Sequence, residues 1–115
     1  MKRQIGVWLA AAGWAVFGLC GSASAADAIK GKQTFVRVGC FECHGHVGQG
    51  GVAGVKLAPD PLPFDAFANF VRTTSRQMPR YSTRILSDDD LADIYAYLTS
   101  IPKPPDPKSI PALSR

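Results

Sequence analysis

The pentapeptide Cys40-Phe41-Glu42-Cys43-His44 decides how the rest of this 115-residue sequence is interpreted. On a helical turn, residues three and four positions apart lie on the same face, so Cys40, Cys43 and His44 project to one side. Two thiols placed in this way can add to two vinyl groups on one side of a porphyrin, and the imidazole then lies beside the iron. The spacing Cys-X-X-Cys-His is the attachment pattern of haem c. It predicts one covalently bound haem, attached through Cys40 and Cys43, with His44 as the proximal iron ligand.

Three other roles for these side chains compete with haem attachment. The first is a structural disulfide between Cys40 and Cys43. The second is a thioredoxin-like redox pair, but no alternation of strands and helices surrounds the motif. The third is a zinc site with four ligands, Cys40, Cys43, His44 and His46. Such sites normally take their ligands from two separated pairs, and the sequence has no second pair. Haem is favoured because an independent feature elsewhere in the sequence agrees with it.

That independent feature is Met78, which is the only methionine after Met1. It lies in a stretch without clear periodicity, 34 residues after His44, and Pro79 follows it. A methionine is more often a gap-filling core residue than a ligand. Yet a haem with a proximal histidine needs a second ligand or an open site, and His/Met ligation is typical of electron-transfer cytochromes, where the thioether raises the potential. We therefore expect Met78 to be the distal ligand, in a loop that Pro79 stiffens.

The composition fits one small globular domain. The sequence is 46% hydrophobic and 19% charged, which is too apolar for a disordered chain. The net charge is +4, but the first 26 residues contribute two basic residues and no acidic one, so the remainder carries 11 basic and 9 acidic residues. This near balance argues against a nucleic-acid-binding protein, which usually has a strongly basic face.

The first 25 residues have the pattern of a secretory signal peptide. A basic start precedes an apolar run from Ile5 to Cys20, and Ala23-Ser24-Ala25 fits the small-x-small rule for cleavage. The pattern predicts export to the periplasm. The alternatives are an uncleaved signal that anchors the protein in a membrane, and lipid attachment at Cys20, which the bulky Leu19 before it disfavours.

The remaining sequence predicts three helices and a tail. Helices are expected over residues 27–38, with Asp27 as its cap, over 63–73, and after Ser87 up to Pro102. We divide the sequence into a signal peptide (1–25), one domain (26–101) and a Pro-rich C-terminal tail (102–115). The five prolines of the tail favour polyproline II or disorder and exclude helix.

From Ala28 to Pro102 the sequence resembles the class I cytochromes c, the small single-haem type. The resemblance is carried by Gly31 and Phe35, by the Cys40 to His44 motif, by Met78-Pro79, and by Ile94-Tyr95-Ala96-Tyr97-Leu98. It implies an all-α, cytochrome c-like fold with three main helices around one covalently bound haem. It also implies that the first and last helices cross at a close contact, with Gly31 and Phe35 against Ile94 and Tyr97.

The resemblance further implies a proline carbonyl that accepts the N–H of the proximal imidazole. Such a bond fixes the ring and raises its basicity. Pro59 is the first candidate in this sequence, and Pro61 is the second.

The resulting hypothesis is a periplasmic carrier of single electrons, not an enzyme, between a dehydrogenase and an oxidase or other acceptor. A looser similarity connects Phe70-Val71-Arg72 and the segment from Tyr97 to Pro102 with cytochrome subunits of periplasmic flavin dehydrogenases. If Met78 is not a ligand, the alternative is a gas-binding or weakly peroxidatic haem protein.

Four arginines surround the Met78 loop, in a stretch from Ala66 to Ser87 that contains no acidic residue: Arg72, Arg76, Arg80 and Arg84. One interpretation is a solvated surface from which one or two arginines neutralise haem propionates. The other is a positive rim that steers an acidic partner.

Overall fold

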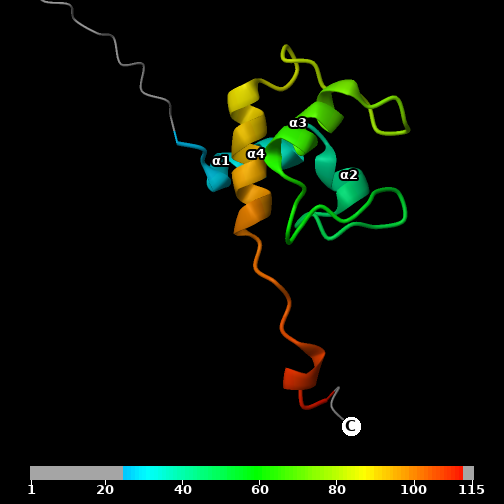
Figure 1. Cartoon of the computed structure of the whole chain (residues 1–115), viewed down its shortest axis with the longest axis vertical. Coiled ribbons are helices and arrows are strands. Elements are labelled where there is room, and N and C mark those ends of the chain that lie inside the picture. The colour runs from blue at the N-terminus through cyan, green and yellow to red at the C-terminus, as the bar shows by residue number, and fades with distance from the viewer. Residues whose placement is uncertain (1–24, 113–115) are drawn as a thin grey trace, which may run out of the picture.

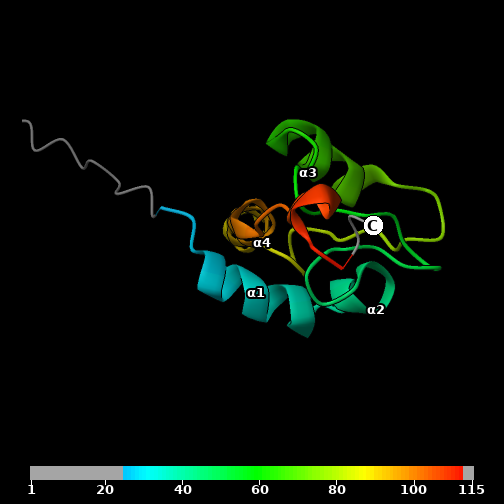
Figure 2. The same ribbon diagram turned by 90° about the horizontal axis from the view of Figure 1, so that it is seen from below.

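Helix α4 (Asp88–Ser100) lies at the centre of the fold, between α1 (Ala28–Arg37) and α3 (Phe64–Thr73), as Figure 1 and Figure 2 show. The computed structural model describes residues 25–112, so the predicted signal peptide lies outside the described residues except for Ala25. A short helix α2 (Cys40–His44) follows α1. The prediction of an all-α fold with three main helices is confirmed, and residues 25–112 contain no strand. None of the helices within that range is both apolar enough and long enough to cross a membrane.

Helices α1 and α4 cross at a close contact. A β-carbon on Gly31 would lie 2.9 Å from the Ile94 amide nitrogen and closer still to the Asp93 carbonyl, so only glycine lets the two backbones approach in this way. One turn later, the rings of Phe35 and Tyr97 meet edge to face, with centroids 5.7 Å apart. The crossing predicted from the family resemblance is therefore confirmed in its residues.

Local sequence explains where both helices begin. The Asp27 carboxylate accepts hydrogen bonds from the amides of Ile29 (2.8 Å) and Lys30 (3.2 Å), which caps α1. The Ser87 hydroxyl accepts from the Asp90 amide at 3.0 Å and caps α4. Three aspartates occupy the first turn of α4, where the helix dipole favours negative charge.

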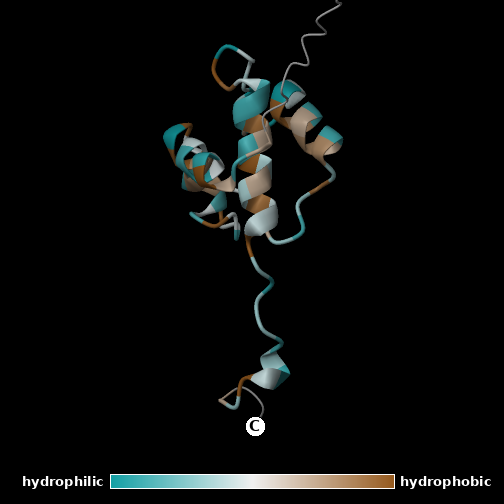
Figure 3. Cartoon of the chain, turned by 90° about the vertical axis from the view of Figure 1, so that its left-hand side faces the viewer, coloured by the Kyte–Doolittle hydropathy of each residue, from teal (hydrophilic) through white to brown (hydrophobic). Residues whose placement is uncertain are grey.

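The buried face of α4 forms the centre of the core. Leu91, Ile94 and Leu98 are almost completely buried, and they repeat at helical spacing. Figure 3 shows how hydrophobic and hydrophilic residues alternate along this helix. Burial of each large side chain contributes about 1.5–3 kcal/mol. On the α3 side, the Tyr95 ring contacts the Phe64 and Phe67 rings, with centroids 5.1 and 5.6 Å away.

The C-terminal tail leaves the end of α4 and extends away from the helices (Figure 1). Lys103 pairs with Asp60 at 3.0 Å near the base of the tail. Further on, residues Pro107–Ser109 form a 3₁₀ turn, η1, capped by the Asp106 side chain. The prediction that the tail excludes helix is wrong at this point. Proline is tolerated in the first turn, where its missing N–H has no acceptor, so Asp106 and Pro107 can begin a short helical turn.

Candidate haem site

Helix α2 carries the attachment motif, and a glycine sets its direction. Gly39 has φ of 82°, a left-handed conformation that separates α2 from α1. The Gly39 carbonyl then accepts from the Glu42 amide at 3.2 Å. The helical turn predicted from the sequence is therefore present, and Cys40 and Cys43 are both free thiols.

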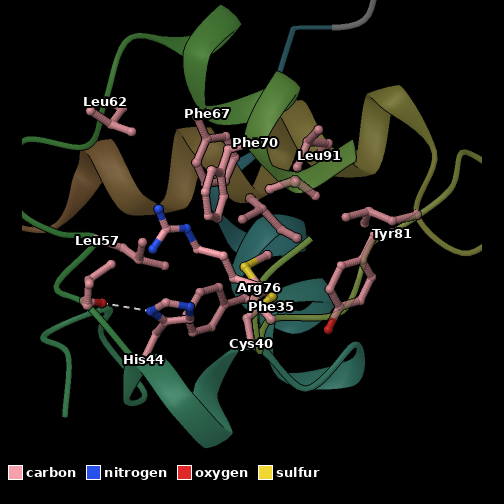
Figure 4. A pocket seen from close by; sticks show the side chains of 15 residues that line it. Phe35, Cys40, His44, Leu57, Leu62, Phe67, Phe70, Arg76, Tyr81 and Leu91 are labelled. Carbon is pink, nitrogen blue, oxygen red and sulfur yellow. Dashed lines mark hydrogen bonds between the residues drawn. The ribbon is translucent and has the colours of Figure 1, made fainter. Parts of the chain in front are cut away.

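A cavity of about 370 Å³ opens between α2, α3 and α4, and Figure 4 shows the side chains around it. Cys40 and His44 lie in its wall, as does Met78 from the loop after α3. Most of the other lining side chains are apolar: Phe35, Val55, Leu57, Leu62, Phe67, Phe70, Val71, Leu86, Leu91 and Ile94. A neighbouring hollow is lined by Cys40, His44 and Met78 together with Cys43 and Pro79. The structure thus brings the two cysteines, the histidine and the methionine to one place.

The His44 imidazole is held by a backbone carbonyl. Its Nδ1–H donates to Val55 O at 2.7 Å, drawn as the dashed line in Figure 4. This bond fixes the tautomer and leaves the other ring nitrogen, Nε2, as a base that can bind a metal.

The expectation that Pro59 or Pro61 supplies this carbonyl is wrong. The loop approaches the imidazole earlier, at Gly54 and Val55. A β-carbon on Gly54 would lie 2.9 Å from His44 Nδ1 and 2.7 Å from the Cys43 carbonyl oxygen, so the approach requires glycine. Gly54 is the sequence signal that could have identified the true acceptor.

Tyr81 is a second residue that the sequence analysis missed. It lies three residues after Met78 and lines the same cavity. Its hydroxyl donates to the Val38 carbonyl at 2.9 Å, which ties the Met78 loop to the end of α1. Burial raises the pKa of Tyr81 above its ordinary value of 10.0, so the phenol remains a donor beyond the neutral range in which any tyrosine is protonated. The sequence near Tyr81 gives no signal for this hydrogen bond, because the acceptor, Val38, is 43 positions away.

Burial also controls the chemistry of Cys40. It raises the pKa of the Cys40 thiol to about 11, so this thiol is neutral at physiological pH in the folded, haem-free chain. Cys43 is exposed. The two thiols therefore differ in their exposure to solvent, although both belong to the same helical turn.

Two of the four arginines around the Met78 loop have structural partners. Arg72 donates to the Asp88 carboxylate at 2.7 Å and to the Tyr81 carbonyl at 2.8 Å. Arg80 donates to the Thr74 carbonyl at 2.7 Å. Arg76 instead lines the cavity. Arg76, Arg80 and Arg84 are exposed, so most of the cluster is solvated, and only Arg72 is partly buried.

The residues present fit a haem. Ligand cavities of this kind are typically apolar, of roughly 300–1,000 Å³, with a few placed polar groups. Here the apolar lining suits a porphyrin, both thiols can form thioethers, and His44 presents a free imidazole nitrogen. His46, the fourth ligand of the zinc alternative, instead stacks its ring on Phe41 with centroids 4.7 Å apart.

A sequence profile of the family described as cytochrome C oxidase, cbb3-type, subunit III matches residues 26–98. The chain belongs to this family of c-type cytochromes. Cys40 and Cys43 are therefore the attachment sites of a covalent haem c, with His44 completing the motif, and the protein is a monohaem electron carrier. This excludes the disulfide and zinc interpretations of the motif.

Two curated relatives are similar to this cytochrome, and both are called cytochrome bc1 complex cytochrome c subunit. The protein from Corynebacterium diphtheriae is 36% identical over 83 residues, which is 70% of this chain and 29% of the relative. The protein from Corynebacterium efficiens is 34% identical over 84 residues, covering 70% and 28%. The chain thus spans less than a third of the length of these relatives. No solved structure matches it significantly.

When bound, the haem supplies an iron that alternates between Fe(III) and Fe(II) one electron at a time. The protein residues have supporting roles around it. Cys40 and Cys43 anchor the ring covalently, and the Val55 carbonyl orients the imidazole. With the haem bound, the apolar side chains of α3 and α4 that line the cavity would exclude water from it.

Proposed function

We propose that this cytochrome transfers single electrons with His44 and Met78 as the two axial ligands of its iron. The observation that carries the proposal is that Met78 lines the same cavity as His44 and Cys40. Met78 is partly buried against the core, although it belongs to a loop. Pro79 and the bond from Arg80 to the Thr74 carbonyl restrict the path of this loop.

Two protein ligands leave no open position on the iron. The protein then has no site for substrate at the metal, and it acts as a carrier and not as an enzyme. A thioether ligand also favours Fe(II), so the reduction potential is higher than with a second nitrogen ligand.

Replacement of Met78 tests this ligation. In Met78→Ala we expect loss of the absorption band near the red edge of the ferric spectrum, a lower reduction potential, and binding of carbon monoxide by the ferrous form. The matched control is Ser75→Ala, an exposed residue in the same loop. An unchanged band and potential in Met78→Ala would refute the proposal. Carbon monoxide binding by the unmodified ferrous protein would favour the gas-binding alternative.

We further propose that the protein works in the periplasm and exchanges electrons with respiratory redox proteins. The signal-like residues 1–25 support export, and the family and relative names refer to cbb3-type oxidase and the bc1 complex. A dehydrogenase on the donor side and an oxidase on the acceptor side are consistent with a carrier of high potential.

The mouth of the cavity suggests where a partner reaches the haem. Val55, Leu62 and Phe70 line the cavity and are also 73%, 61% and 43% exposed. Exposed apolar groups near a binding site are typical of contact surfaces. A free carrier should elute alone and react with its partner at a rate that falls with salt. Stable co-purification with a dehydrogenase or oxidase would instead identify a bound subunit.

A further inference from the structure

The Asp93 side chain of α4 binds the chain just before α1 begins. Its carboxylate accepts a hydrogen bond from the Asp27 amide at 2.6 Å, across 66 positions of sequence. Asp93 is partly buried, and no ion pair found within residues 25–112 involves it. The carboxylate therefore has a neutral donor and no cation as its partner in this part of the chain.

The two residues before Asp27 lie in the same place. Ala25 and Ala26 line a small hollow together with Asp93, and Figure 2 shows this blue segment reaching the helices beside α4. The other charged side chains nearby are Asp27 and Lys30 at the start of α1, and Asp89 and Asp90 at the start of α4. Even with Arg37 paired to Asp90 at 3.4 Å, carboxylates outnumber cations here.

We propose that Asp93 binds the N-terminal ammonium that forms when the signal peptide is removed. The proposal rests on the proposed export, with cleavage after Ala25. Hydrolysis of the Ala25–Ala26 peptide bond consumes one water, leaves a carboxylate on Ala25 and gives Ala26 an amine that is protonated at neutral pH. Ala26 directly precedes Asp27, whose amide already contacts Asp93.

The ion pair would make the stability of the fold depend on processing. In the uncut chain, position 26 contributes only a neutral peptide group. After cleavage, the ammonium lies beside the Asp93 carboxylate only when α1 is docked on α4. A positive charge at the N-terminus of a helix is unfavourable on its own, so the net gain requires the carboxylate. Ala26 is exposed, so the pair is partly hydrated and its contribution is modest.

The test compares two forms of the haem protein, one that begins at Ala26 and one that begins at Gly21. Both are released from a removable fusion after haem attachment. We expect the equilibrium constant for unfolding, from urea titration at pH 7, to be about threefold smaller for the Ala26 form. In Asp93→Asn this difference should vanish, because the side-chain oxygen can still accept from Asp27 but carries no charge. Asp65→Asn is the matched control, an exposed residue of α3 outside the hollow, and it should preserve the difference.

The pH dependence of this difference is a second measurement. An α-ammonium has an ordinary pKa of about 7.7–8.0, and a carboxylate beside it raises that pKa in the folded state. The gain from cleavage is therefore complete below this range and is lost as the pH rises through the folded pKa. A difference that stays constant from about pH 6 to pH 10, or that persists in Asp93→Asn, would overturn the proposal. If Asp93→Asn does not accumulate, the pH series decides alone.

The intact mass of the protein exported from its full-length sequence tests the cleavage separately. We expect loss of residues 1–25. A chain that keeps these residues would overturn this proposal together with the signal-peptide hypothesis. Equal stabilities of the Ala26 and Gly21 forms, with cleavage confirmed, would overturn the ion pair alone.

Discussion

On one side of the cavity, His44 belongs to a helix and is held by neighbours close in sequence. On the other side, Met78 belongs to a loop that has local bonds and also depends on a distant segment. The Gly50 amide donates to the His44 carbonyl at 2.8 Å, and Val55 accepts from the ring. The Met78 loop is held locally by the bond from Arg80 to the Thr74 carbonyl, but it is also tied through the Tyr81 hydroxyl to the Val38 carbonyl, 43 residues earlier. Segments with few buried contacts open locally at a lower free energy than the core, and the residues on both sides of Met78, 75–77 and 79–80, are exposed. The histidine side should therefore be the more robust one.

The largest loss of stability is expected from a substitution at Gly54, where the loop approaches the His44 ring. In Gly54→Ala, the new methyl group would overlap His44 Nδ1 and the Cys43 carbonyl, and backbone atoms cannot move aside cheaply. We expect a loss of about 2–3 kcal/mol in the free energy of unfolding, measured by urea titration of the haem protein.

Gly51→Ala is the control for this change. A β-carbon there would lie 3.6 Å from the Cys43 carbonyl, an ordinary contact. Equal stabilities of the two variants would mean that the close approach of the loop to His44 has no energetic importance.

A smaller effect is expected on the methionine side from Tyr81→Phe. The substitution removes the hydroxyl that binds the Val38 carbonyl, at a cost of about 1–1.5 kcal/mol. We expect roughly tenfold tighter binding of added imidazole to the ferric protein, because the loop opens more readily while the core remains folded. Tyr95→Phe is the control, since the Tyr95 ring contacts α3 but its hydroxyl makes no hydrogen bond within the described part of the chain. Equal imidazole affinity in both variants would contradict the comparison.

The smallest loss of stability is expected from removing the hydrogen bond that joins Tyr97 of α4 to the loop after α2. The Tyr97 hydroxyl donates to the His46 carbonyl at 2.7 Å, and burial raises the pKa of Tyr97 above its ordinary value of 10.0. The folded state therefore holds this proton more tightly than the unfolded chain. The resulting stabilisation is complete below about pH 10 and is lost as the pH rises through the folded pKa. We expect Tyr97→Phe to cost about 1 kcal/mol at pH 8, and the difference to shrink at higher pH. A constant difference between pH 8 and pH 11 in urea unfolding would refute this assignment.

Local rules explain which parts of the structure were predictable. Caps at Asp27 and Ser87 and apolar spacing placed the helices within a residue or two of their observed ends. The motif fixed a helical turn because its three side chains must share one face. The family resemblance supplied the crossing of α1 and α4, which periodicity alone does not give.

The errors arise where the path of a loop matters. The acceptor for His44 depends on how a glycine-rich loop folds back, and the expectation at Pro59 relied on the family pattern instead of the glycine at position 54. The partners of Arg72 and Tyr81 were equally inaccessible, because Asp88 and Val38 lie far away in the sequence. The turn at Asp106-Pro107 did have a local signal, but the number of prolines in the tail obscured it.

The position of α4 at the end of the domain has a consequence for biogenesis. Leu91 and Ile94 form part of the cavity wall, yet they follow the cysteines by about fifty residues. During synthesis, the complete attachment motif is therefore made before the residues of α4 that close the cavity. Covalent attachment of the porphyrin and its shielding from water are therefore separable events. A product truncated before α4 would keep the attachment cysteines but lack this wall of the cavity.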